Sequence, residues 1–217
     1  MRLSVMLLVG TFGLSGVARA QSAPPTSSKG YVEAVAQSAF SNVTSQSFGA
    51  EVGVTIVPNV QVFVEGGQVH NVATADISAS AQAVAGSLSQ TQANVLYSVK
   101  QPVTFGVTGV RFIVPMVGKV QPYVMGGGGV AKVKQDVTFT VGGTDVTSTL
   151  AQAPYNVQLG SDLSGTFTKP MLVLGGGVVW PAWQQIIVDF QYRYGRIFAE
   201  DGGINVSRAG IGIGVRF

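Results

Sequence analysis

The sequence predicts an all-β protein, an eight-stranded antiparallel up-and-down β-barrel whose strands cross a membrane. Three observations lead to this fold class. Apolar and polar residues alternate along successive segments, the connections between those segments alternate in length, and the composition is more apolar than that of a soluble domain. Hydrophobic residues make up 46% of the chain and charged residues 11%, against about 25% charged residues in soluble domains.

The first 20 residues have the features of a secretory signal peptide. A positive start precedes the apolar stretch Leu3–Leu14, and a small-x-small pattern ends at Ala20, after which we expect cleavage. An N-terminal membrane anchor is the alternative, but the stretch is shorter than the ~20 apolar residues that span a bilayer as a helix. The remaining chain divides into a short lead, residues 21–29, and one barrel domain, residues 30–217.

Charge and cysteine content narrow the class of protein further. The chain has 13 Lys+Arg and 10 Asp+Glu, but Arg2 and Arg19 lie in the leader, so the exported part is close to neutral. A near-neutral surface gives no reason to expect a nucleic-acid partner. Cysteine is absent, which excludes a small exported fold held by disulfides. After the leader no apolar run approaches the ~18 residues of a membrane helix.

Alternation is clearest in the last two segments. From Ile187 to Phe198, apolar and aromatic side chains occupy one face, and Asp189, Gln191 and Arg193 occupy the other. From Ser207 to Phe217, apolar residues alternate with two arginines and three glycines. In a small membrane barrel, the apolar face points outward to lipid and the polar face points into the lumen.

Six further segments show the same period with more noise and bring the number of predicted strands to eight. They are Gly30–Phe40, Phe48–Val57, Val60–His70, Pro102–Pro115, Val120–Val133 and Pro170–Pro181. The phase of Pro102–Pro115 is ambiguous, because Val103, Phe105 and Val107 share the parity of Arg111. A β-bulge would reset the phase and let the apolar residues face lipid.

The connections between the predicted strands alternate between short and long. Short turns at residues 57–60, 115–119 and 181–184 alternate with longer polar segments at residues 41–47, 71–101, 134–169 and 199–204. Short turns on one rim and long loops on the other are typical of membrane barrels. We expect Asp136–Val141 to extend a strand, and Asn71–Asn94, rich in Ala, Ser and Gln, to be mobile.

Aromatic residues gather toward the ends of the predicted strands. Aromatic residues suit strands in general, but their positions favour two belts at the two membrane interfaces. The belt near the short turns would contain Tyr31, Phe112, Tyr123, Trp180, Trp183 and Phe217, and the belt near the long loops Phe40, Phe48, Phe105 and Phe198.

Three segments carry a resemblance to a known family. Val120–Gly129 resembles the fifth strand of the small outer-membrane β-barrels, the family of the opacity-type porins and of the membrane domain of outer membrane protein A. Asp189–Tyr194 resembles the seventh strand of that family, and Gly212–Phe217 resembles the last. The resemblance covers nearly all of residues 21–217.

The resemblance implies a location and two partners. It implies that the exported chain lies in the bacterial outer membrane, in contact with its lipid. It also implies that Phe217, with Val215 and Ile213 before it, forms the signal that the barrel-assembly machinery reads in the last strand. No further periplasmic domain is visible, so a peptidoglycan-binding role is not expected.

Eight charged residues are predicted to face the lumen from their parity along the strands. They are four acids and four bases, Glu33, Glu51, Glu65, Arg111, Asp189, Arg193, Arg208 and Arg216. The interior of an eight-stranded barrel is just wide enough for side chains. Isolated buried charges are costly, whereas paired ones are tolerated. We therefore expect a network of ion pairs rather than separately hydrated side chains.

The sequence leaves three functions open. The first is a structural or surface-interaction role, with a surface ligand bound by loops 71–101 and 134–169, because loops on a rigid scaffold commonly carry binding. The second is a narrow pore for small solutes or apolar molecules. The third, a lipid-modifying enzyme, rests on His70 alone, with Asp76 and Ser78 nearby in sequence.

The enzyme interpretation is the weakest of the three. A catalytic base needs a nucleophile and an orienting acid in contact with it, and proximity in sequence does not supply that contact. We therefore expect no enzymatic activity, no catalytic residues and no cofactor. With one histidine and no cysteine, a metal site of the usual nitrogen and sulfur type is not expected either.

Overall fold

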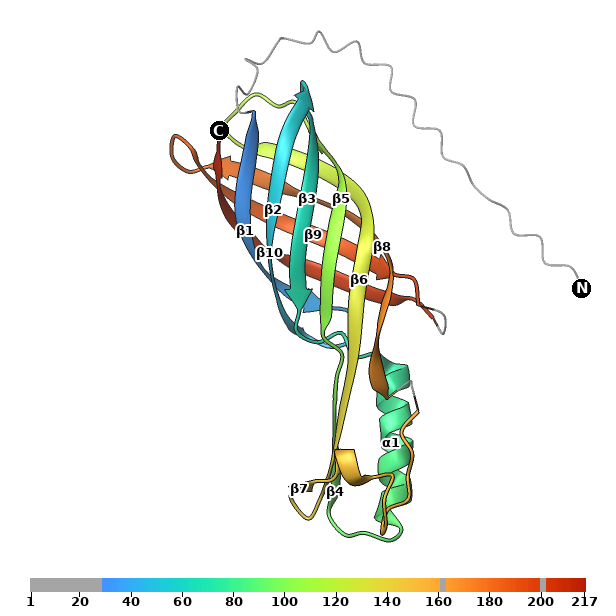
Figure 1. The fold of residues 1–217 in the computed structure, drawn as a ribbon. Coiled ribbons are helices and arrows are strands. Elements are labelled where there is room, and N and C mark those ends of the chain that lie inside the picture. The colour runs from blue at the N-terminus through green and yellow to red at the C-terminus, as the bar shows by residue number, and fades with distance from the viewer. Residues whose placement is uncertain (1–28, 161–162, 200–201) are drawn as a thin grey trace, which may run out of the picture.

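The computed structural model describes residues 29–160, 163–199 and 202–217. The predicted leader, residues 1–20, and residues 21–28 of the predicted lead lie outside the described residues. Within them, eight strands close into an antiparallel barrel in which each strand pairs with the next and the last pairs with the first (Figure 1). These strands are β1 (Gly30–Phe40), β2 (Ser45–Val57), β3 (Val60–Val69), β5 (Val103–Ile113), β6 (Gln121–Val141), β8 (Ser164–Pro181), β9 (Ile186–Ile197) and β10 (Ile204–Arg216). The predicted fold class is confirmed.

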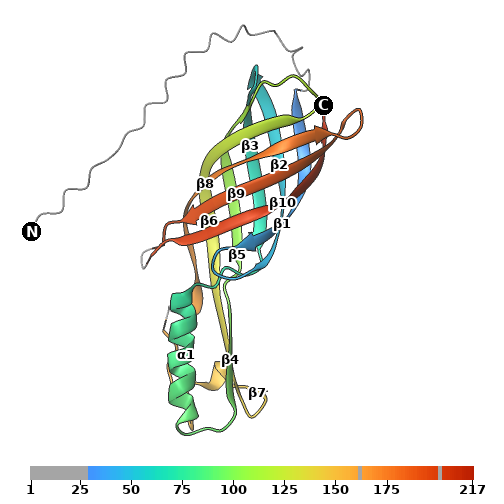
Figure 2. The ribbon, with the colours of Figure 1, turned by 180° about the vertical axis from the view of Figure 1, so that it is seen from behind.

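Side chains alternate between the lumen and the outer surface, as the pleat of a strand requires. In β1 the odd-numbered residues from Tyr31 to Ala39 are buried, and the even-numbered residues from Val32 to Phe40 are exposed. The seam between β10 and β1 runs in unbroken register from Tyr31, opposite Arg216, to Phe40, opposite Ser207. Seen from behind, β8, β9 and β10 form the wall opposite β2 and β3 (Figure 2).

Strand β5 keeps one phase along its whole length, and the bulge considered from the sequence does not occur. Its ladders with β3 and β6 show continuous register, and Val103, Phe105, Val107 and Arg111 are all buried in the lumen. The reason is that the lumen is not polar throughout. Near the long connections it is apolar, so apolar residues of β5 can face inward there.

Strands β6 and β8 continue beyond the barrel wall and carry a second folded part, which we call the lobe (residues 73–100, 135–160 and 163). The part of β6 that extends past β5 pairs with β4 (Val95–Lys100) instead. The lobe also contains α1 (Ala75–Ser89), β7 (Thr144–Asp145) and the short 3-10 helix η1 (Thr147–Thr149). It projects from the end of the barrel that lies away from the C-terminus and the short turns (Figures 1 and 2).

Helix α1 corrects the expectation that residues 71–94 form a mobile loop. The side-chain oxygen of Thr74 caps the helix by accepting from the N–H of Ile77. Alanine has the highest helix propensity, and one buried stripe runs along Ile77, Ala81, Ala85 and Leu88. This spacing of three to four residues places all four on one face. No helix in the described part of the chain is long and apolar enough to cross a bilayer.

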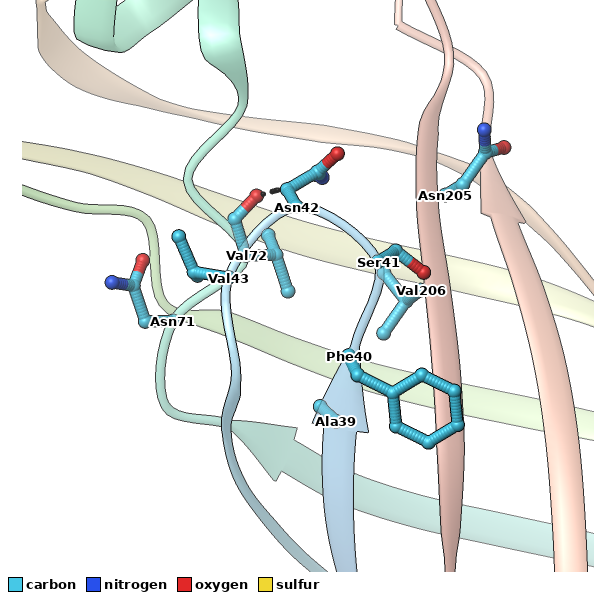
Figure 3. A pocket seen from close by; sticks show the side chains of 9 residues that line it. All are labelled: Ala39, Phe40, Ser41, Asn42, Val43, Asn71, Val72, Asn205 and Val206. Atoms are coloured by element: carbon cyan, nitrogen blue, oxygen red, sulfur yellow. Dashed lines mark hydrogen bonds between the residues drawn. The ribbon is translucent and has the colours of Figure 1, made fainter.

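Short polar contacts tie the two residues that precede the lobe to the barrel rim. Asn42 Nδ2 donates to the Val72 carbonyl at 3.2 Å (Figure 3), and Ser45 Oγ donates to the Asn71 carbonyl at 2.6 Å. The side-chain oxygen of Asn71 accepts from the backbone N–H of Ala73 at 3.0 Å. The cavity drawn in Figure 3 holds about 10 Å³, which is room for one water molecule at most. The segment that leads into the lobe is therefore fixed to the rim by hydrogen bonds.

Candidate functional site

Six buried charged side chains form a chain across the lumen in which acids and bases alternate. Their order is Asp189, Arg111, Glu51, Arg193, Glu65 and Arg208. Neighbouring nitrogen and oxygen atoms lie 2.5 to 3.3 Å apart, and no member is more than 1% exposed. The members come from β2, β3, β5, β9 and β10, so the chain ties together strands on opposite sides of the barrel.

Glu51 lies at the centre of this chain and accepts from three donors. Its Oε1 atom accepts from Arg111 Nη2 at 2.6 Å and from the Tyr31 hydroxyl at 2.5 Å. Its Oε2 atom accepts from Arg193 Nη1 at 2.5 Å. Hydrogen bonds to an ionised acceptor are the stronger kind, and here they are fully removed from water. Glu51 therefore fixes the positions of both arginines.

Glu33 is a seventh member of the cluster but is held more loosely. It is 2% exposed, and its Oε1 atom lies 3.6 Å from Arg111 Nη2 and 3.8 Å from Arg193 Nη2. Neither of its carboxylate oxygens accepts a hydrogen bond from the described residues. The cluster thus contains four acids and three bases, one base fewer than the parity of the strands predicts.

Arg216 is the predicted member that lies outside the cluster. Its guanidinium donates from Nε and Nη2 to the Gln184 carbonyl, at 3.2 and 3.0 Å, in an exposed contact. Arg216 is the last residue of β10 and stands at the short-turn rim. From there its side chain bonds to the neighbouring turn.

Two tyrosines that were predicted for the aromatic belts face the lumen instead and support the cluster. Tyr123 donates to Asp189 Oδ2 at 2.7 Å, as Tyr31 donates to Glu51. The Arg111 guanidinium stacks over both rings, 4.6 Å from the centroid of Tyr31 and 3.9 Å from that of Tyr123. Such cation–π contacts are strongest when water is excluded. Sequence analysis missed both roles, although both tyrosines have the parity of lumen residues.

A glycine lies directly opposite each of these tyrosines on the neighbouring strand. Gly53 pairs with Tyr31, and Gly177 pairs with Tyr123. A Cβ atom on Gly53 would lie 2.2 Å from the Tyr31 ring, and one on Gly177 would lie 2.7 Å from the Tyr123 hydroxyl. Because glycine has no side chain, each tyrosine ring can lie against the inner wall of the barrel, over the glycine opposite it. Phe105 and Gly67 repeat this arrangement beneath Arg208, whose guanidinium stacks over the Phe105 ring at 4.3 Å.

Apolar side chains fill the part of the lumen nearest the lobe. This apolar layer contains Val69, Val103, Ala131, Val133, Met171, Val173, Ile197, Ile204 and Val206, all at most 4% exposed. The predicted belt residue Phe105 also points inward here. A layer of this kind excludes water and ions, because it offers them no hydrogen-bonding partner. The lumen is thus filled in two regions, by charged side chains in one and by apolar side chains in the other.

The outer surface of the barrel is apolar, with its exposed aromatic residues near the two rims. Phe112, Trp180, Trp183 and Phe217 are exposed at the short-turn end, and Phe40, Phe48 and Phe198 at the lobe end. The remaining three residues of the predicted belts face the lumen. Ile213 and Val215 of β10 and Phe217 directly after it all point outward. The N–H and carbonyl groups of Phe217 bond to Gly30. The last residue therefore closes the seam.

The barrel is similar in structure to two solved outer-membrane proteins. Neisserial surface protein A matches with a TM-score of 0.55 and 16% identity, over 88% of this chain and 98% of its own. A major outer membrane protein of Thermus thermophilus matches with a TM-score of 0.51 and 9% identity, over 87% of this chain and 99% of its own. The chain has the fold of the small outer-membrane β-barrels. No family model and no curated protein sequence matches this barrel at a significant level.

The structure describes His70, the residue on which the enzyme interpretation rests. It is exposed at the end of β3, where its backbone N–H donates to the Gln46 carbonyl. The hydroxyl of Ser78 donates to the Thr74 carbonyl of its own helix, and no hydrogen bond between described residues joins His70 to Asp76. In the same residues, no group of three or more His, Cys, Asp or Glu side chains could hold a metal.

Proposed function

We propose that the chain is a bacterial outer-membrane protein whose barrel is a filled anchor and whose lobe is a contact surface outside the cell. The outward apolar band fits lipid, the fold is one found in outer membranes, and the lobe lies opposite the short turns. Cleavage of the leader after Ala20 belongs to this proposal. The barrel then serves to hold the lobe in place, without enzymatic chemistry.

The observation that carries the proposal is that the lobe has a hydrophobic core of its own. Buried side chains of α1 pack with Val137 and Phe139 of β6 and with residues that follow β7. The core contains Ala73, Ile77, Ala81, Ala85, Leu88, Val137, Phe139, Val146, Leu150 and Leu163. A loop that only connects strands needs no such core. A packed lobe can present the same surface to a partner each time, since it loses little entropy on binding.

The tip of the lobe is ordered by local hydrogen bonds as well. Asp145 Oδ1 accepts from the hydroxyl of Thr147 at 2.6 Å and from its backbone N–H at 2.9 Å. These two hydrogen bonds, the side-chain bond first, lower the pKa of the exposed Asp145 carboxyl below its usual value. A turn that bonds to itself in this way supports a defined surface rather than a passive linker.

The pore alternative is disfavoured by the filling of the lumen. A conducting path would have to pass both the alternating charge chain and the apolar layer. Neither region has space for a hydrated ion, because their side chains are at most 4% exposed and in contact. The same filling suits an anchor, which gains rigidity from it.

Orientation can be tested by inserting one epitope tag at either end. A tag between Thr91 and Gln92, in the turn after α1, should be labelled by antibody on intact cells. A tag between Pro58 and Asn59, in a short turn, should be labelled only after the outer membrane is opened. The reverse labelling pattern would place the lobe inside and overturn the proposal.

The contact role can be tested by excising the lobe. Residues 73–100 and 135–163 would each be replaced by a short Gly–Ser linker, and cells with either form would be compared for adhesion to host-cell and matrix surfaces. We expect the lobe-less barrel to insert and to leave membrane integrity unchanged while adhesion falls to the level of cells without the protein. Unchanged adhesion, or a leaky membrane in the lobe-less strain alone, would contradict the role.

We also propose that the last strand is recognised during assembly, with Phe217, Val215 and Ile213 as the contact residues. All three are exposed on one face. Deleting Phe217 should lower the amount of heat-modifiable, folded protein in the outer membrane. Arg216→Gln, on the opposite face of the same strand, is the matched control and should leave that amount unchanged.

A further inference from the structure

The outer wall of the barrel changes from apolar to polar on four neighbouring strands, β3, β5, β6 and β8, as they approach the lobe (Figure 1). The last exposed apolar or glycine residues are Gly66, Gly106, Val130 and Pro170, and the next exposed residues toward the lobe are Gln68, Thr104, Lys132 and Thr168. Each set forms one row of directly opposed residues across the four strands. In a membrane barrel such a change marks the end of the hydrocarbon layer and the start of the lipid headgroups.

Lys132 places a free positive charge at this boundary. Its side chain is exposed on the outer face of β6, and its ammonium makes no ion pair or hydrogen bond within the described residues. The next lysine on the same face differs, because Lys134 Nζ lies 3.3 Å from Asp136 Oδ2. Lysine side chains at the edge of the hydrocarbon layer extend toward lipid headgroups, where they attract anionic lipids.

Two threonines flank Lys132 on the neighbouring strands. Thr104 of β5 and Thr168 of β8 lie directly opposite it, one on either side, and both are exposed. Their hydroxyls make no hydrogen bond within the described part of the chain, whereas the hydroxyl of Thr108, also on the outer face of β5, donates to the Phe63 carbonyl at 3.0 Å. Neighbouring strands lie about 4.8 Å apart, so one phosphate above Lys132 is within reach of both free hydroxyls, and an ammonium with hydroxyl donors suits a phosphate.

Bare backbone lies beside this polar row, on its apolar side. A Cβ atom on Gly106 would meet no atom within 4 Å, and one on Gly128 would meet only the Met171 carbonyl oxygen, at 3.8 Å. Neither glycine has a positive φ, so neither a turn nor a close approach within the barrel requires glycine at these positions. An acyl chain can pack closely against this flat surface, next to the exposed side chain of Val130.

From these observations we infer that the outer face of β5, β6 and β8 binds one anionic lipid. Its phosphate lies on Lys132, Thr104 and Thr168, and one of its acyl chains lies against Gly106. The position at the end of the apolar band selects the phosphate of a lipid over a phosphate in solution. The inference rests on the proposed membrane location of the barrel, and it adds a lipid site on the barrel wall to the contact surface on the lobe.

The test uses the full exported chain refolded in detergent, with bound lipids counted by native mass spectrometry. The probes are dioleoylphosphatidylglycerol and dioleoylglycerol, which share their acyl chains and differ in the phosphate headgroup. We expect the phosphate-bearing lipid to bind more tightly, and Lys132→Gln to weaken its binding about fivefold, as the loss of one cation beside a headgroup implies. Lys132→Arg keeps the charge and should retain binding. Thr168→Val should weaken it by about twofold, the effect of one weak hydrogen bond.

Two further variants separate a defined site from general attraction. Lys100→Gln removes the same charge from an exposed position on β4, opposite Asp136 and outside the barrel wall. It is the matched control and should leave binding unchanged. Gly106→Leu has room for its side chain and should weaken the binding of both probes, because it covers the flat backbone.

Four results would overturn the inference. They are equal binding of the two probes, unchanged binding in Lys132→Gln, an equal loss in Lys132→Gln and Lys100→Gln, and displacement of the lipid by an equal concentration of glycerol 3-phosphate. The last would indicate a site for soluble phosphates rather than for a lipid. If Lys132→Gln fails to fold, as judged by heat modifiability, Thr168→Val decides. Epitope labelling and adhesion are measured separately, so failure here does not imply failure of the proposed anchor and contact role.

Discussion

The two halves of the lumen are filled in opposite ways. Toward the short turns, charged groups fill it through directed contacts, with Glu51 holding Arg111 and Arg193 at 2.6 and 2.5 Å. Toward the lobe, apolar side chains such as Val133 and Ile197 fill it by close packing. The difference teaches that an interior too narrow for water can be closed either by pairing charges or by excluding them. The two solutions should respond differently to mutation.

Removing a charge should have the largest effect. Arg193→Ala leaves Glu51 and Glu65 each short of a partner in a region with no exposure. Breaking a buried pair in this way typically costs about 3–5 kcal/mol. The free energy of unfolding in urea, measured on protein refolded in lipid vesicles, should fall by this amount. Arg216→Ala, at the exposed rim, should cost about 1 kcal/mol or less, and equal losses in the two variants would contradict the role of the charge chain.

Adding a side chain at the glycine opposite a lumen tyrosine should have a smaller effect. In Gly177→Ala the new Cβ would lie 2.4 Å from the Phe190 carbonyl oxygen and 2.7 Å from the Tyr123 hydroxyl. Overpacking of this kind costs about 1–3 kcal/mol, and it should displace the hydroxyl that donates to Asp189. Gly106→Ala is the control, because its Cβ would meet no atom within 4 Å. The same unfolding assay should separate the two variants, and indistinguishable stabilities would argue against a tyrosine held by its glycine.

Trimming the apolar half should have the smallest effect. Ile197→Val removes one methylene from a side chain with no exposure, which typically costs about 0.5–1.5 kcal/mol. No group is left unpaired, so the loss should stay well below that of Arg193→Ala. Ile213→Val, on the lipid face, should cost less still. An Ile197→Val loss as large as that of Arg193→Ala would erase the distinction between the two halves.

The barrel could be predicted from the sequence far better than the lobe. Alternation with period two indicates which face of a strand looks inward. In the structure, seven of the eight predicted lumen residues, Glu51 and Arg193 among them, lie buried together, and Arg216 lies at the rim. Parity says nothing of height along the barrel axis, so it could not show that Arg216 stands at the rim. It also could not show that apolar residues of β5 face inward, because that depends on what the other seven strands supply.

The lobe was missed for a different reason. Its helix lies in an Ala-, Ser- and Gln-rich stretch that was interpreted as a mobile loop. The signal was present, in Thr74 as a cap and in the spacing of Ile77, Ala81, Ala85 and Leu88. Two of those four positions are alanine, which is only weakly apolar, so the stripe is faint until β6 is seen to extend beneath it. The cavity between the start of α1 and the lobe end of the barrel could not be predicted at all, since it joins residues from five separate segments.

The central claim is that the barrel is a filled anchor, and single-channel conductance of the purified protein in a planar bilayer tests it most directly. The wild-type protein should show no steady conductance, because the charge chain and the apolar layer block the path in series. Arg193→Ala removes only one of the two barriers and should conduct at most in brief, small events. A steady, large conductance in the wild type, unaltered by Arg193→Ala, would contradict the filled lumen and establish the barrel as a pore.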